Sequence, residues 1–129
     1  MRKVIRTSDG PAPRGIYSQA ILADGFVFVS GQAAVNPKTN GLELGDIKSE
    51  THRTLENIRA ILDSAGSSLR EVVKVGVFLA DIGDFAAMNE VYREFFPEDP
   101  PARTTVGAQL PKIKIEIDCI ARVRKRLRR

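Results

Sequence analysis

Histidine, cysteine and tryptophan are almost missing from this chain of 129 residues, which has one histidine, one cysteine and no tryptophan. A Ser-His-Asp or Cys-His catalytic arrangement would have to use His52, and its neighbours Ser49 and Glu56 in the first predicted helix indicate a solvent-facing position, which disfavours both arrangements. One histidine and one cysteine, far apart, also make no zinc site. The single Cys119 excludes an intrachain disulfide, which agrees with a reducing compartment. We therefore expect a cytoplasmic protein that holds no metal ion.

Long apolar runs are missing as well. No stretch approaches the ~20 consecutive apolar residues that a membrane-spanning helix needs. The N-terminal residues MRKVIRTSDGPAPRG include basic side chains but lack the apolar segment of a secretory signal. No glycine-rich phosphate loop occurs, because GLELG has neither the lysine nor the spacing of one. These absences disfavour a membrane protein, a secreted protein and cofactor-dependent redox chemistry.

The net charge of +4 belongs to the C-terminal end of the chain. The last eight residues, RVRKRLRR, carry six of the twenty basic side chains, and without them fourteen basic residues face sixteen acidic ones. Residues 122–129 therefore form a basic tail on an acidic body. Such a tail can contact nucleic acid through its phosphates, and it can equally be a solvated end that favours solubility.

The size and composition are those of one soluble globular domain, residues 1–129, with a sizeable buried core. Asp-Gly between two extended runs predicts a β-hairpin turn. Runs rich in β-branched residues, bounded by turn formers, predict the other strands. Strands are expected over Lys3–Arg6, Tyr17–Leu22, Phe26–Ser30, Glu71–Ala80, Thr104–Gln109 and Lys112–Arg122.

Two segments have helical rather than alternating periodicity. Apolar residues recur at three- and four-residue spacing from Asp46 to Ala65, which predicts an amphipathic helix, and Gly66 suits its C-terminal end. A second helix is expected over Phe85–Phe96, with Asp84 as its N-cap and Pro97 ending it.

This order of elements predicts a two-layer α/β sandwich in which both helices cover one face of the sheet. Phe26–Ser30, the first helix and the strand at Glu71–Ala80 form a crossover that should be right-handed, with parallel strands. In KIKIEIDCIAR the apolar residues from Ile113 to Cys119 should face the helices, while Lys114, Glu116, Asp118 and Ile120 face the other way. The second face is half apolar, and we expect a homo-oligomer to cover it.

Arg103 and Glu116 are the candidate functional residues. The preceding PPA turn fixes Arg103 at the start of a strand, where its planar guanidinium can bind a carboxylate with two hydrogen bonds; a structural salt bridge is an equal alternative. A carboxylate in mid-strand can act as a general acid or base or can orient a water molecule. It can equally pair with Lys114, Arg122 or a neighbouring subunit.

Six segments carry most of the remaining information, and they occur along the chain in this order: GIYSQA, VFVSGQAAVNPKTN, TLENIRAILDSAG, VVKVGVFLADIGDFAAMNEVYREFF, PPARTTV and LPKIKIEIDCIA. Through these segments the whole chain resembles the RidA/YjgF family of enamine/imine deaminases. It implies a chorismate-mutase-like fold, a homotrimer with clefts between subunits, and hydrolysis of reactive 2-imino acids and their enamine tautomers without a cofactor.

The resemblance also assigns roles to single residues. Arg103 matches the arginine that holds the substrate carboxylate, and Glu116 matches the glutamate that positions the attacking water. We expect these two to be the ends of one small site, completed across a subunit boundary. The residues that match the lining of the cleft are Tyr17, Ser30, Gly31 and Asn89, with Thr105 also expected to bind substrate.

Three positions depart from the family pattern. Thr105 stands where several members have a cysteine, Gly107 replaces a common glutamate, and Ile16 replaces a common proline. Thr105 excludes thiol chemistry at its position, and all three leave the choice of substrate open.

Several functions agree with these features. The first is deamination of small imino acids such as 2-iminopropionate or 2-iminobutyrate, and a close variant acts on a larger enamine such as an aminomuconate. The second is an RNA-acting protein, an endoribonuclease or translation inhibitor, that uses the basic tail. The acidic body and the absence of an aromatic stacking motif disfavour it. The third is a module that binds 2-oxo acids without turnover.

Overall fold

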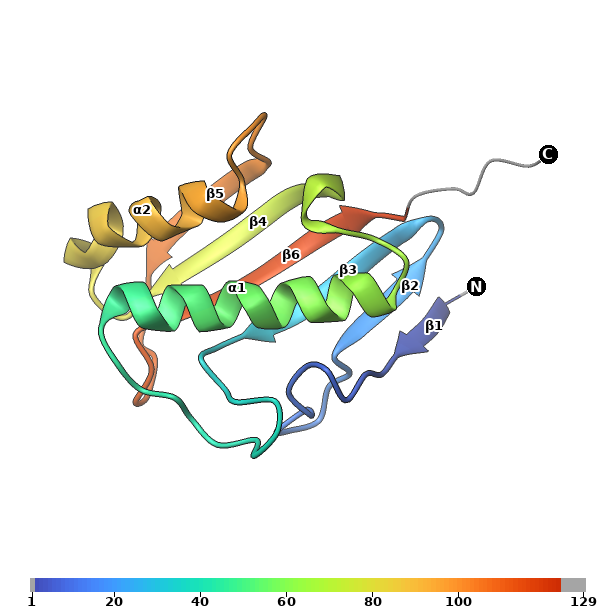
Figure 1. The fold of residues 1–129 in the computed structure, drawn as a ribbon, viewed down its shortest axis with the longest axis horizontal. Coiled ribbons are helices and arrows are strands. Elements are labelled where there is room, and N and C mark those ends of the chain that lie inside the picture. The colour runs from blue at the N-terminus through green and yellow to red at the C-terminus, as the bar shows by residue number, and fades with distance from the viewer. Residues whose placement is uncertain (1, 124–129) are drawn as a thin grey trace.

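A computed structural model describes residues 2–123 as one mixed sheet with two helices on the same side of it (Figure 1). The two-layer arrangement expected from the sequence is therefore confirmed. None of the described helices is long and apolar enough to cross a bilayer. The strands are β1 (Arg2–Ile5), β2 (Ala20–Ala23), β3 (Phe26–Gln32), β4 (Val72–Leu79), β5 (Ala102–Gly107) and β6 (Ile115–Arg122), and the helices are α1 (Ile47–Ser64) and α2 (Phe85–Phe95).

The sheet has the order β1-β2-β3-β6-β4-β5. β6 is antiparallel to both β3 and β4 and lies between them. β3 and β4 therefore run in the same direction, as the crossover predicted, but they are not neighbours. β4 and β5 form the parallel pair of the described sheet. This order leaves β5 at one edge, next to α2.

The β2–β3 hairpin turns at Asp24 and Gly25, as predicted. Both residues have positive φ, 50° and 82°, which is the backbone of a type I′ turn. β2 begins only at Ala20, three residues later than expected. The residues before it form a loop, in which the Tyr17 hydroxyl accepts a hydrogen bond from the Arg14 N–H at 3.0 Å.

The two helices begin differently. Asp46 caps α1, because its carboxylate accepts a hydrogen bond from the Ser49 N–H at 2.8 Å, and Gly66 follows the helix with a φ of 79°. Asp84 stands at the N-cap position of α2, as expected, but its side chain makes no cap hydrogen bond. Asp81 instead caps the short 3₁₀ turn before α2 by accepting from the Gly83 N–H at 2.8 Å.

The core lies between the helices and one face of the central strands. Ile115, Ile117 and Cys119 of β6 are buried there, as the alternation predicted. The alternation in β4 is interrupted, because the register of its pairing with β6 shifts between Val72 and Lys74. Val72 is therefore buried together with Val75, Val77 and Leu79, whereas Val73 is exposed.

Lys114 also departs from the expected alternation. It precedes β6, and its ammonium lies 3.7 Å from a carboxylate oxygen of Glu50 on α1 rather than on the open face of the sheet. The open face is the one that the helices leave uncovered, and Glu116 and Asp118 lie on it. Half-buried and exposed apolar side chains surround them: Phe26, Phe28, Phe78, Val106 and Ile120.

Candidate active site

Arg103 and Glu116 lie on opposite faces of the sheet. Arg103 pairs with Val75, whose side chain is buried under the helices, whereas Glu116 pairs with Phe78 on the same strand. Positions three residues apart along a strand point to opposite faces. One chain therefore does not bring Arg103 and Glu116 into one pocket. It presents two separate groups of side chains, which we describe in turn.

The Arg103 cluster consists of Arg103, Asn89, Tyr92 and Phe85, with β5 supplying the arginine and α2 the other three. Arg103 Nη1 donates a hydrogen bond to Asn89 Oδ1 at 2.8 Å. Its Cζ lies 4.6 Å from the centre of the Tyr92 ring and 5.4 Å from that of Phe85, distances at which cation–π attraction operates. Within residues 2–123 Arg103 forms no salt bridge. A structural salt bridge, the alternative that the sequence left open, is thus not made within the described chain.

The surroundings of Arg103 keep its guanidinium available. Burial raises the pKa of the Tyr92 hydroxyl to about 12, so the ring stays neutral at ordinary pH. Thr105 lies two residues further along β5 on the same face, and its Oγ1 is buried with no hydrogen-bond partner among the described residues. A cavity of about 430 Å³ adjoins Arg103, Asn89 and Tyr92. The cluster can therefore accept a small anion.

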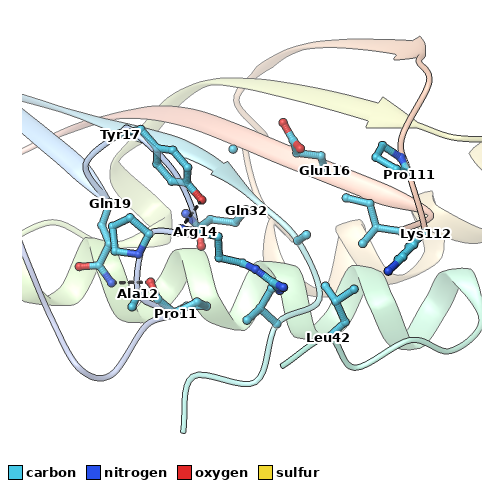
Figure 2. Close-up of a pocket in the computed structure, with 15 residues that line it drawn as sticks. Pro11, Ala12, Arg14, Tyr17, Gln19, Gln32, Leu42, Pro111, Lys112 and Glu116 are labelled. Atoms are coloured by element: carbon cyan, nitrogen blue, oxygen red, sulfur yellow. Dashed lines mark hydrogen bonds between the residues drawn. The ribbon is translucent and has the colours of Figure 1, made fainter. Parts of the chain in front are cut away.

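The Glu116 pocket is a second cavity, of about 400 Å³, where the loop before β2 approaches the end of β3 and the start of β6 (Figure 2). Tyr17, Gly31 and Glu116 line it together with two basic residues, Arg14 and Lys112. Its volume falls within the roughly 300–1,000 Å³ that small-molecule pockets occupy. Three residues that the sequence singled out, Tyr17, Gly31 and Glu116, thus line one cavity.

The electrostatic setting of Glu116 favours proton transfer. Partial burial, and then the charge of nearby Asp118, raise the pKa of its carboxyl above the usual value of 4.5. Glu116 has no ion-pair partner among residues 2–123, because Lys114 pairs with Glu50, and Arg122 pairs with Glu71. A carboxylate with a raised pKa that forms no ion pair within the described residues is a suitable general base.

Gly31 and Ser30 contribute in different ways. A Cβ at Gly31 would overlap the Glu116 carboxylate, so glycine makes room for that group. The Ser30 hydroxyl donates a hydrogen bond to the Ser18 carbonyl at 2.6 Å and is not among the groups that line the Glu116 pocket. Ser30 therefore ties β3 to the loop that carries Tyr17.

Several buried polar residues that support these groups were not singled out from the sequence. The Gln19 amide accepts from the Thr7 N–H at 2.7 Å and donates to the Pro11 carbonyl at 2.8 Å, which fixes the loop before β2. The Asn57 amide donates to the Val35 carbonyl at 2.8 Å. Such residues can be recognised in a sequence as polar residues at positions where the helical or strand periodicity predicts apolar ones.

These side chains define what the two groups can do. A guanidinium with a free hydrogen-bonding edge can bind a carboxylate, and a carboxylate with a raised pKa can take a proton from water. Among residues 2–123 no cluster of three or more histidine, cysteine, aspartate or glutamate side chains is placed to hold a metal ion.

Known proteins resemble this chain along nearly its whole length. Residues 7–123 match the family described as Endoribonuclease L-PSP. A RutC family protein of Pyrococcus horikoshii is 53% identical over 94% of this chain and 98% of its own length. A rat protein named 2-iminobutanoate/2-iminopropanoate deaminase is 45% identical over 94% of this chain and 90% of its own.

The fold has the same relatives. The crystal structure of RidA from an Antarctic Psychrobacter superimposes with a TM-score of 0.89 at 41% identity, covering 94% of this chain and 99% of that one. The similarity of sequence and the similarity of structure both extend over nearly the whole chain. This chain therefore belongs to the RidA/YjgF/L-PSP family.

Proposed function

We propose that this protein is an enamine/imine deaminase that hydrolyses 2-iminopropanoate, 2-iminobutanoate and related 2-imino acids to 2-oxo acids and ammonia without a cofactor. The rat relative at 45% identity has the name of this activity. The observation that carries the proposal is the state of Arg103. Neutral partners, Asn89 and Tyr92, hold its guanidinium, and no carboxylate of the described chain neutralises it.

The reaction needs little from the enzyme beyond positioning. Water attacks the electrophilic carbon of the protonated imine and gives a carbinolamine, while the Glu116 carboxylate accepts a proton from that water. Glu116 then returns that proton to the carbinolamine nitrogen and accepts the proton of the new hydroxyl group as the C–N bond breaks. The products are a 2-oxo acid and ammonia. Arg103 holds the substrate carboxylate throughout. Orientation of this kind can contribute several kcal/mol to catalysis, about 7–11 in favourable cases.

A homotrimer with clefts between subunits would complete the site. Arg103 and Glu116 lie on opposite faces of one sheet, so the reaction requires the Arg103 cluster of one subunit to face the Glu116 pocket of the next. The edge position of β5 and the apolar side chains of the open face support such an assembly. Size-exclusion chromatography with light scattering tests this, and a monomer with full activity would contradict it.

Competition with a chemical trap tests the activity itself. A dehydratase generates 2-iminobutanoate from threonine, and semicarbazide traps the imine unless this protein hydrolyses it first. The wild type should lower the trapped signal, whereas Arg103→Ala and Glu116→Gln should not. Wild-type trimers that leave the trapped signal unchanged would rule out deamination of this substrate.

An RNA-acting function is the second candidate, because the family description names an endoribonuclease and the chain ends in a basic tail. Most of that tail, residues 124–129, lies outside the described residues. RNA binding that falls steeply with salt and disappears when residues 124–129 are deleted would support it.

The cytoplasmic location stays a prediction, which fractionation of cells would test.

A further inference from the structure

Two basic side chains share the Glu116 pocket, and the proposed reaction uses neither. Arg14 comes from the loop before β2, and Lys112 comes from the segment before β6. With Glu116 they are the charged residues that line the cavity, which therefore has an excess of one positive charge. Neither forms a salt bridge with any residue between 2 and 123.

The two cations lie apart from the reacting carboxylate. Figure 2 shows Glu116 on the side of the pocket formed by the sheet. Arg14 and Lys112 lie toward the opposite side, and Leu42 lies between these two basic side chains. A ligand that reaches from Glu116 to these side chains would also contact apolar groups of the pocket lining, which include Ile113 and Leu42. The pocket thus has a reactive end and a basic end.

The chain holds both basic residues in place through their backbones. The Arg14 N–H donates to the Tyr17 hydroxyl at 3.0 Å. Lys112 has a φ of 73°, a left-handed conformation that is uncommon for a residue with a side chain. Conformations of this kind concentrate at functional sites, where the surrounding structure enforces them. Two residues later, the Lys114 N–H is bound by the buried carboxylate of Glu50 at 2.9 Å, which supports this segment.

We propose that Arg14 and Lys112 form a subsite for a second acidic group of the substrate. The preferred substrate class is then an imino acid whose side chain ends in a carboxylate. Its imine carbon would lie at Glu116 and its distal carboxylate between Arg14 and Lys112. The arginine offers a planar pair of donors for that carboxylate, and the lysine adds a point charge. This inference rests on the proposed deaminase function and specifies its substrate.

Steady-state kinetics with two matched imines tests the subsite. An amino acid oxidase generates 2-iminoglutarate, with an acidic side chain, or 2-iminobutanoate, with a neutral one. We expect kcat/KM to be higher for the acidic imine. In Arg14→Met and in Lys112→Met the ratio of the two kcat/KM values should fall about tenfold, the usual effect of one charge-assisted hydrogen bond.

Arg6→Met is the matched control, because Arg6 lines a second cavity that shares Tyr17 with the Glu116 pocket, but does not line the Glu116 pocket itself. It should leave the ratio unchanged. A ratio that stays within twofold of wild type in both pocket variants would overturn the subsite, and so would an equal fall in the control. Circular dichroism and the oligomeric state of each variant must match the wild type.

A binding measurement separates failure of the subsite from failure of the deaminase proposal. If the wild type hydrolyses neither imine, the deaminase proposal fails, and calorimetry with the 2-oxo acids still tests the subsite. 2-Oxoglutarate should bind more tightly than 2-oxobutanoate, and Arg14→Met should remove the difference. Equal affinities of the wild-type protein for these two acids would overturn the subsite.

Discussion

Gly31 on β3 leaves the space in which the carboxylate of Glu116 on β6 lies. A Cβ built at Gly31 would overlap the carboxylate and the adjacent methylene of Glu116. The backbone conformation of Gly31 does not itself require a glycine, because the described glycines with positive φ are Gly25 and Gly66. Glycine is therefore required at position 31 because a larger side chain would occupy the space of the Glu116 carboxylate, the group proposed to activate water.

Gly31→Ala should consequently displace the Glu116 carboxylate without unfolding the protein. We expect kcat for 2-iminobutanoate to fall roughly ten- to a hundredfold, because a shift of about 1 Å in a reacting group can have this effect. The trap assay measures it. Gly41→Ala, in the exposed turn before α1, is the control, since a Cβ there meets only the Thr39 hydroxyl at 3.4 Å. Equal activities of the two variants would contradict the role of Gly31.

The pH dependence of the reaction should report the pKa of Glu116. Burial first, and the charge of Asp118 second, raise that pKa above the usual 4.5. The carboxylate form is present above the raised pKa, so kcat/KM should be lost as the pH falls through it, at a higher pH than an ordinary glutamate would give.

Asp118→Asn should shift this loss of kcat/KM, the acidic limb of the pH profile, to lower pH. The substitution removes one of the two causes of the raised pKa of Glu116. The limb should still lie at a higher pH than that of an exposed glutamate, because the partial burial of Glu116 remains. Asp63→Asn, an exposed position on α1, is the control with the same change of charge. A limb that does not move in Asp118→Asn would show that the limb belongs to another group.

Tyr92 should hold Arg103 through its ring rather than through its hydroxyl. The Cζ of Arg103 lies 4.6 Å from the ring centre, and the hydroxyl stays protonated with a pKa of about 12. Tyr92→Phe should leave KM close to wild type, whereas Tyr92→Leu should raise KM several-fold, in line with about 1 kcal/mol of cation–π energy. A similar KM for both variants would contradict this role. Urea unfolding of both variants separates this effect from a general loss of stability.

Local signals in the sequence predicted most of the fold. The turn at Asp24 and Gly25, the start of α1 at Asp46 and the burial of alternate residues in β6 all depend on neighbours within a few positions. The insertion of β6 between β3 and β4 could not be predicted in this way, because strand order depends on contacts between distant segments. The bulge at Val72–Lys74 is a similar case, since it appears only in the pairing with β6.

The sequence identified candidate residues for the site but not how they lie relative to one another. The resemblance identified Arg103 and Glu116, and the side-chain alternation of single strands did not reveal that the two lie on opposite faces. That relation depends on the registers of β4 with β5 and with β6. Asn89 lies fourteen positions before Arg103 and binds it, which is likewise a consequence of how α2 packs on β5.

Glu50 should be the carboxylate on which the shape of the Glu116 pocket most depends. It is fully buried on α1, and its two oxygens accept from the Lys114 N–H at 2.9 Å and from the Gly45 N–H at 3.1 Å. One side chain thus joins the segment before α1 to the segment before β6, and the second of these carries Lys112.

Glu50→Ala should lower the free energy of unfolding by about 3 kcal/mol, because two backbone N–H groups lose their acceptor, each at roughly 1–3 kcal/mol. Glu50→Gln should have a smaller effect, since the amide oxygen still accepts one hydrogen bond. Lys114→Met removes the half-exposed ammonium but leaves both N–H contacts, so it should cost under about 1 kcal/mol. Urea unfolding at one protein concentration compares the three variants. A loss in Lys114→Met as large as that in Glu50→Ala would mean that the ion pair, and not the two backbone contacts, holds these segments together.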